Sequence, residues 1–137
     1  MPDKYDVVAQ IRQAVPFPVA NGEHEYTRYG FENLLATGVE MVQPDVTWCG
    51  GLTELLKIKE MAAARDCLVV PHGSSVYSYH FAITSQATPF AEFLMMAAQA
   101  DRIVPMFSPL FVDEPVPVDG YLDLPDKPGF GVEFNPG

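Results

Sequence analysis

The chain has 137 residues, of which 48% are apolar and 19% are charged; this balance is typical of a folded domain and excludes a disordered one. The formal net charge of −10 argues against binding to nucleic acid or to an anionic membrane surface, because like charges repel. No apolar run reaches the ~20 residues of a membrane-spanning helix, and the first residues lack the pattern of a signal peptide. We therefore expect a cytoplasmic protein with no nucleic-acid or membrane partner.

Helix and strand patterns alternate in the first part of the chain. Apolar residues recur at helical steps at four early positions: Tyr5, Val8, Ile11 and Val15. This spacing predicts a helix over 3–15, which two prolines end before an extended segment. A second helix is predicted over 26–36, closed by a glycine, and a short strand over 39–42.

The alternation continues after the Gly50-Gly51 turn. The broad apolar face of 52–62 predicts a helix, and the almost continuous apolar run 67–70 is typical of a strand buried on both faces. A weaker helix over 76–84 and a last short strand over 90–94 complete the series. Helices alternating with strands in this way predict an α/β fold with a parallel sheet.

The character of the sequence changes after about residue 101. Seven of the 13 prolines lie in the last third of the chain, interleaved with aromatic residues. This composition favours an irregular segment that packs on other structure over a helix. We therefore divide the chain into an alternating part, 1–100, with four βα units, and an irregular C-terminal extension, 101–137.

Four polar residues stand at the ends of successive apolar runs: Glu23, Asp45, His72 and Glu92. Parallel α/β sheets collect their active-site residues at the edge where the strands end. If Asp45 and His72 end neighbouring strands, the carboxylate can orient the imidazole and leave its other nitrogen free to move a proton. The alternative is that His72 only caps the turn that contains it.

The other polar candidates have two interpretations each. Glu23 stands in a polar cluster with His24 and Glu25, which suits Mg²⁺ if further carboxylates come from elsewhere, or is a solvated loop. Glu92, inside an apolar run, is either a surface-facing strand residue or a site carboxylate. We expect Cys49 and Cys67 to be buried hydrophobic residues, with a catalytic thiol as the alternative.

Five stretches of the sequence resemble the mandelate racemase branch of the enolase superfamily, most closely its L-rhamnonate dehydratases. They are GEHEYTRYGF at 22–31, QPDVTW at 43–48, PHGS at 71–74, PFAEF at 89–93 and LPDKPGFG at 124–131. The resemblance extends over essentially the whole chain. It implies that 1–100 are the C-terminal half of a (β/α)₈ TIM barrel, about strands 5–8, and that the extension packs on the barrel or on a capping domain.

The resemblance also implies a reaction and a role for each candidate residue. Glu23 corresponds to a metal ligand for Mg²⁺, Asp45 and His72 to a catalytic dyad, and Glu92 to the acid that binds the substrate carboxylate. His24 corresponds to a residue that touches the sugar acid. The implied activity is that of a hydro-lyase of carbohydrate catabolism, which dehydrates a six-carbon acid sugar, L-rhamnonate, to 2-keto-3-deoxy-L-rhamnonate by α-proton abstraction and β-elimination.

The resemblance implies partners as well. The capping domain and the first four barrel strands of the family have no counterpart in the 137 residues, so we expect the N-terminal half of the enzyme as a partner and an isolated chain that is inactive. We also expect a homo-oligomer. The alternatives are a non-catalytic half-barrel that associates with itself, and a racemase or another acid-sugar dehydratase of the same superfamily.

Overall fold

The computed structural model describes residues 4–73 and 75–137. Its first seven elements alternate in chain order: α1 (Tyr5–Ala14), β1 (Ala20–Asn21), α2 (Thr27–Leu35), β2 (Met41–Val42), α3 (Leu52–Ala63), β3 (Leu68–Val69) and α4 (Val76–Thr84). Two further strands follow, β4 (Phe111–Val112) and β5 (Glu133–Phe134). The helix predicted over 3–15 is present, although its predicted first residue, Asp3, lies outside the described residues, as does Ser74 of the PHGS stretch.

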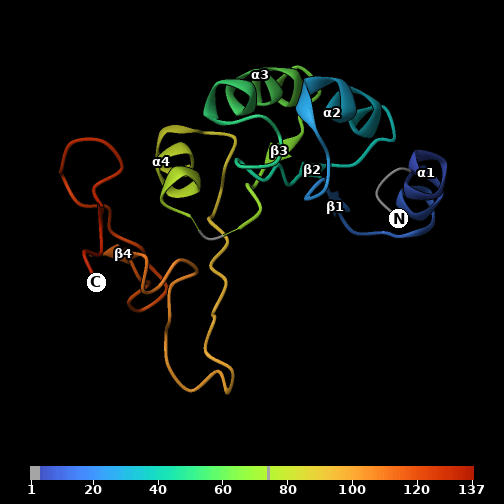
Figure 1. Ribbon diagram of the computed structural model, residues 1–137. Helices are drawn as coiled ribbons and strands as arrows, with labels where there is room; N and C mark the ends of the chain where they lie inside the picture. The colour runs from blue at the N-terminus through green and yellow to red at the C-terminus, as the bar shows by residue number, and fades with distance from the viewer. Residues whose placement is uncertain (1–3, 74) are drawn as a thin grey trace.

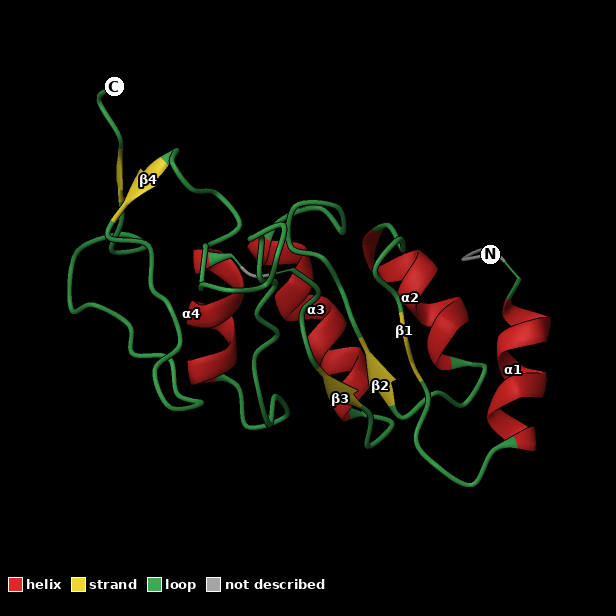
Figure 2. Cartoon of the chain, turned by 90° about the horizontal axis from the view of Figure 1, so that it is seen from below, coloured by secondary structure: helices red, strands yellow, loops and turns green. Residues whose placement is uncertain are grey.

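The first three strands form a parallel sheet in the order β1-β2-β3. Ala20 pairs with Met41, and Met41 pairs in turn with Leu68. Helices α2 and α3 cover one face of this sheet, while α1 lies beside β1 and α4 lies beyond β3 (Figures 1 and 2). The predicted parallel α/β architecture is therefore confirmed, and its successive βα units form an arc of a barrel.

The hydrophobic core lies between the sheet and helices α2 and α3. Its fully buried side chains come from both layers: Phe31, Leu34, Val42, Leu55, Ile58 and Val69. Burying each such side chain is worth about 1.5–3 kcal/mol. This packing fixes the three strands against two helices, so that the ends of the strands are held at one edge.

The strand predicted over 90–94 is not formed: residues 86–97 contain no β-strand. In this region the Val69 N–H donates to the Ala87 carbonyl at 3.0 Å. A β-strand is defined by the ladder it makes with its neighbours, and apolar composition alone does not supply that ladder. The sequence pattern was therefore misleading at this point.

The C-terminal extension is mostly irregular and contains the short antiparallel pair β4–β5, which the sequence did not predict. The extension contacts α4 through Phe130, whose ring packs edge-on against Tyr77 at 5.0 Å and against His80 at 5.5 Å. None of the helices in the described part of the chain combines the length and apolar character needed to cross a membrane.

Candidate active site

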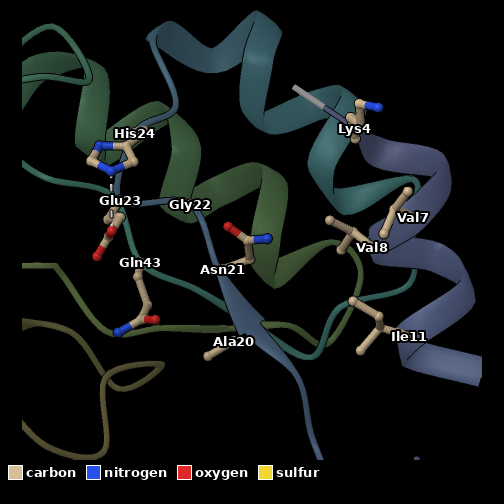
Figure 3. A pocket seen from close by; sticks show the side chains of 10 residues that line it. All are labelled: Lys4, Val7, Val8, Ile11, Ala20, Asn21, Gly22, Glu23, His24 and Gln43. Carbon is tan, nitrogen blue, oxygen red and sulfur yellow. Dashed lines mark ion pairs between the residues drawn. The ribbon is translucent and has the colours of Figure 1, made fainter. Parts of the chain in front are cut away.

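The loop after β1 carries Glu23 and His24 at the end of the strand (Figure 3). Gly22 precedes them with a φ of +129°, and a Cβ there would lie 2.8 Å from the Phe31 ring. Only glycine fits such a position without displacing the core, so the tight strand end directs Glu23 out of the core. Glu25 does not join it: this carboxylate is buried and accepts a hydrogen bond from the Tyr5 hydroxyl at 3.0 Å.

Asp45 and His72 end the next two strands and lie side by side. They form an isolated parallel bridge, in which the His72 N–H donates to the Pro44 carbonyl at 3.1 Å. The His72 Nδ1 atom lies 3.3 Å from Asp45 Oδ2. The contact expected between these two side chains is therefore present, and it can hold the imidazole in one tautomer with Nδ1 protonated.

The second carboxylate oxygen of Asp45 is held by its own loop. Asp45 Oδ1 accepts hydrogen bonds from the Thr47 N–H at 2.8 Å, from Thr47 Oγ1 at 2.6 Å and from the Trp48 N–H at 3.2 Å. Three donors on one oxygen leave the carboxylate little freedom to rotate. The orientation of Asp45 is thus set independently of His72, and Asp45 can orient His72 in turn.

The remaining candidates connect to this pair. His72 Nε2 lies 3.2 Å from Glu23 Oε2, and Glu23 Oε1 lies 3.2 Å from His24 Nε2. The Gly73 N–H donates to Glu92 Oε2 at 2.6 Å, which holds that carboxylate beside His72. The structure thus brings all five predicted residues to one edge of the sheet, whereas the roles that the resemblance implies for them stay predictions.

The candidate residues differ in how far their side chains are exposed to solvent. The side chains of Glu23 and His24 are about half exposed, at 49% and 50%, whereas that of Asp45 is 14% exposed. Glu23 and His24 line a pocket of about 540 Å³ between β1 and α1 (Figure 3). Glu92 lines another pocket, of about 460 Å³, formed by α4 and the C-terminal extension. The edge is an open surface against which further chain can pack.

Metal ligands are incomplete in the described residues: no group of three or more histidine, cysteine, aspartate or glutamate side chains in 4–73 and 75–137 is arranged to hold a metal ion. Glu23 supplies one carboxylate of the kind that Mg²⁺ prefers. A magnesium site with three protein carboxylates would need ligands from outside the described residues.

Both cysteines are buried, as predicted, and neither is in a disulfide. Burial raises the pKa of Cys49 to about 11, with a smaller contribution from the charge of Asp45, and burial likewise raises the pKa of Cys67 to about 11. Because the thiolate is the reactive form, thiols of such high pKa are poor nucleophiles at neutral pH. The catalytic-thiol alternative is not supported.

Two residues of the site were missed in the sequence. Thr47 follows Asp45 at the two-residue spacing of an Asx turn, a signal from which its contact with the carboxylate could be inferred. Trp48 packs against His24, with ring centroids 5.4 Å apart. Nothing local signals this second contact, because the two residues lie on different loops.

Barrels built from parallel βα units carry their active sites at the edge where the strands end, and at that edge this chain places His72 between two carboxylates. The family model described as "Enolase C-terminal domain-like" matches residues 1–137. The chain belongs to this family.

Among curated proteins, the chain is 58% identical over 139 residues to an L-rhamnonate dehydratase of Saccharopolyspora erythraea; the match covers 99% of this chain and 36% of that protein. Among solved structures, an L-rhamnonate dehydratase from Gibberella zeae is 50% identical with a TM-score of 0.92, covering 98% of this chain and 36% of that one. A rhamnonate dehydratase from Gibberella zeae complexed with Mg is 48% identical with a TM-score of 0.90, covering 98% and 34% respectively. The chain thus spans about a third of the length of these relatives.

Proposed function

We propose that this chain is the C-terminal barrel part of a Mg²⁺-dependent acid-sugar dehydratase that converts L-rhamnonate to 2-keto-3-deoxy-L-rhamnonate. The observation that carries the proposal is the Asp45–His72 pair, in which Nδ1 of the imidazole lies 3.3 Å from Asp45 Oδ2. The 58% identity to an L-rhamnonate dehydratase supports the choice of substrate.

In the proposed reaction, His72 is the proton carrier. Asp45 accepts a hydrogen bond from the Nδ1–H group of His72, so that Nε2 is the unprotonated, basic atom that removes the proton α to the substrate carboxylate. The hydroxyl group at C3 then leaves, and protonation by His72 releases it as water. The resulting enol tautomerises to the 2-keto-3-deoxy acid, so that the overall reaction is the loss of one water from the substrate.

Negative charge develops on the substrate carboxylate when the α-proton is removed. Mg²⁺, when bound, supplies Lewis-acid stabilisation of that charge. In this chain Glu23 is the candidate ligand. Glu92, held by the Gly73 N–H at 2.6 Å, is the candidate residue for binding the substrate carboxylate. His24, beside Glu23, is the candidate contact for a hydroxyl group of the sugar acid.

The partner that we propose is the chain that precedes this segment in the longer relatives. Within the described residues, strand β1 pairs with β2 alone, and its other edge faces a pocket lined by three apolar side chains of α1: Val7, Val8 and Ile11 (Figure 3). In a βαβ unit the crossover is right-handed, so the strand before α1 belongs on this open edge of β1. That strand would also close the pocket beside Glu23. The expected homo-oligomer stays a prediction.

A chimera tests this function directly. The 139 matched residues of the Saccharopolyspora erythraea L-rhamnonate dehydratase are replaced by this chain, and the product is assayed with L-rhamnonate and Mg²⁺. We expect a 2-keto product, removal of that activity by a chelator, and its loss in His72→Asn. A folded chimera that forms no keto product, or only an epimer of the substrate, would overturn the dehydratase proposal; an epimer would favour the racemase alternative.

A further inference from the structure

Three aromatic rings from two loops stack at the rim of the site. The centroid of Trp48 lies 5.4 Å from that of His24, with the ring planes at 45°, and 5.7 Å from that of Tyr26, at 31°. His24 and Tyr26 belong to the loop after β1, whereas Trp48 belongs to the loop after β2. We call these three residues the rim stack.

Hydrogen bonds hold the Trp48 backbone in place. Its N–H donates to Asp45 at both the carbonyl, 3.1 Å, and Oδ1, 3.2 Å. The Thr27 N–H donates to the Cys49 carbonyl at 3.0 Å, which ties the two loops together beside the rings. The hydrogen bond that fixes the Trp48 backbone therefore also helps to orient the Asp45 carboxylate.

The side chains of the rim stack are about half exposed. Trp48 is 47% exposed and Tyr26 is 57% exposed, so their rings contribute little to the core, where burial would explain them. What the Trp48 ring does contact is the His24 imidazole, whose Nε2 meets Glu23 at 3.2 Å. The imidazole is thus held by a carboxylate at one end and a ring at its side.

We infer that Trp48 is a positioning residue that holds the His24 imidazole toward the substrate. The Tyr26 ring contacts the indole of Trp48 and supports it. The inference rests on the proposed function, because it assumes that His24 meets a hydroxyl group of an acid sugar. A half-exposed histidine free to rotate would lose rotamer freedom each time substrate binds, and a ring that fixes it beforehand removes that cost.

The first test concerns the contact itself and uses the 137-residue chain. Trp48 is its only tryptophan, so indole fluorescence and indole proton resonances report on this residue alone. We expect nuclear Overhauser contacts between the indole and the His24 ring, and a changed emission intensity in His24→Ala. The matched control is His80→Ala, because His80 packs on Phe130 instead, and it should leave the emission unchanged. Absence of the ring contacts, or equal responses to the two substitutions, would overturn the inference.

The second test is a double-mutant cycle in the chimera. We expect Trp48→Ala to raise KM and lower kcat/KM by roughly two- to tenfold, the range of one aromatic pair, and Trp48→Phe to restore most of the loss. If Trp48 acts through His24, the double variant Trp48→Ala/His24→Ala should be no worse than His24→Ala alone.

The outcomes separate the two proposals. The positioning role would be overturned, and the dehydratase function left intact, by either of two results. In the first, the losses of kcat/KM in the two single variants multiply in the double variant. In the second, Trp48→Ala has the kinetics of the parent chimera. A parent chimera that folds but forms no keto product would overturn the proposed function, and the positioning role with it, even where the ring contact is observed in the chain.

Discussion

The replacement Asp45→Asn in the chimera examines the centre of the proposed site with almost no change of shape. The amide oxygen can take the place of Oδ1, which accepts from the Thr47 N–H, the Thr47 hydroxyl and the Trp48 N–H. The loop should therefore keep its conformation. The amide nitrogen then stands where Oδ2 lies, 3.3 Å from His72 Nδ1. It can only donate, so Nδ1 must become the acceptor and the proton moves to Nε2.

This change of tautomer removes the basic atom from the side of the ring that would meet substrate. A positioned general base contributes about 10²–10⁴-fold to rate, which is about 3–5 kcal/mol of barrier at 1.36 kcal/mol per factor of ten. We therefore expect kcat for L-rhamnonate dehydration to fall by about 10²–10⁴-fold in Asp45→Asn. The assay is the initial rate of 2-keto acid formation at saturating Mg²⁺.

The matched control is Thr47→Val, which removes the Thr47 hydroxyl at 2.6 Å from Oδ1 but keeps both N–H donors on that oxygen. We expect a loss of less than about tenfold, because a single hydrogen bond is removed and the charge of Asp45 remains. The reasoning would be refuted if Asp45→Asn kept kcat within about threefold of the parent at an unchanged unfolding temperature, since a positioned base is worth far more.

Four further predictions concern the 137-residue chain. Isothermal titration calorimetry should detect only weak Mg²⁺ binding, and L-rhamnonate turnover should be immeasurable, because Glu23 is a single candidate ligand; robust turnover would contradict the need for further chain. Glu54→Gln should destabilise the chain at pH 7 and flatten the loss of stability between pH 5 and 3 in urea titrations. The Arg28 N–H lowers the pKa of Glu54 from its ordinary 4.5, so its stabilisation is present above that value and is lost as the pH falls; an unchanged acid profile would count against this. Glu114→Gln should raise Tm at pH 7 but not at pH 3. Burial raises the pKa of Glu114, so the favourable contribution of this carboxyl group to stability is present below pH 4.5 and is lost as the pH rises through the folded-state pKa. Equal shifts of Tm at both pH values would exclude that cause. Ile58→Ala should cost about 2–5 kcal/mol of unfolding free energy in urea, since Ile58 is fully buried; a cost below about 1 kcal/mol would argue against the described core.

Several features of this protein followed from the sequence alone. The helices over 52–62 and 76–84 were predicted within a residue of α3 and α4, because apolar periodicity and flanking glycines act locally. The positions of Glu23, Asp45 and His72 at strand ends could also be predicted. Each follows directly on its own apolar run, and the ends of parallel strands meet at one edge whatever the details of packing.

The tertiary structure decided the rest, since it depends on which segments become neighbours. The buried position of Glu25 under Tyr5 and the packing of Trp48 on His24 join residues some 20 positions apart, and no local pattern encodes such pairs. The strand expected over 90–94 failed for the same reason. Its apolar residues satisfy the composition of a strand, but strand geometry needs a regular hydrogen-bonded ladder with a neighbour, and the described residues 90–94 form no strand. Sequence periodicity thus determined the elements and the edge on which the polar residues gather, whereas the strand order and loop packing determined which of those residues touch.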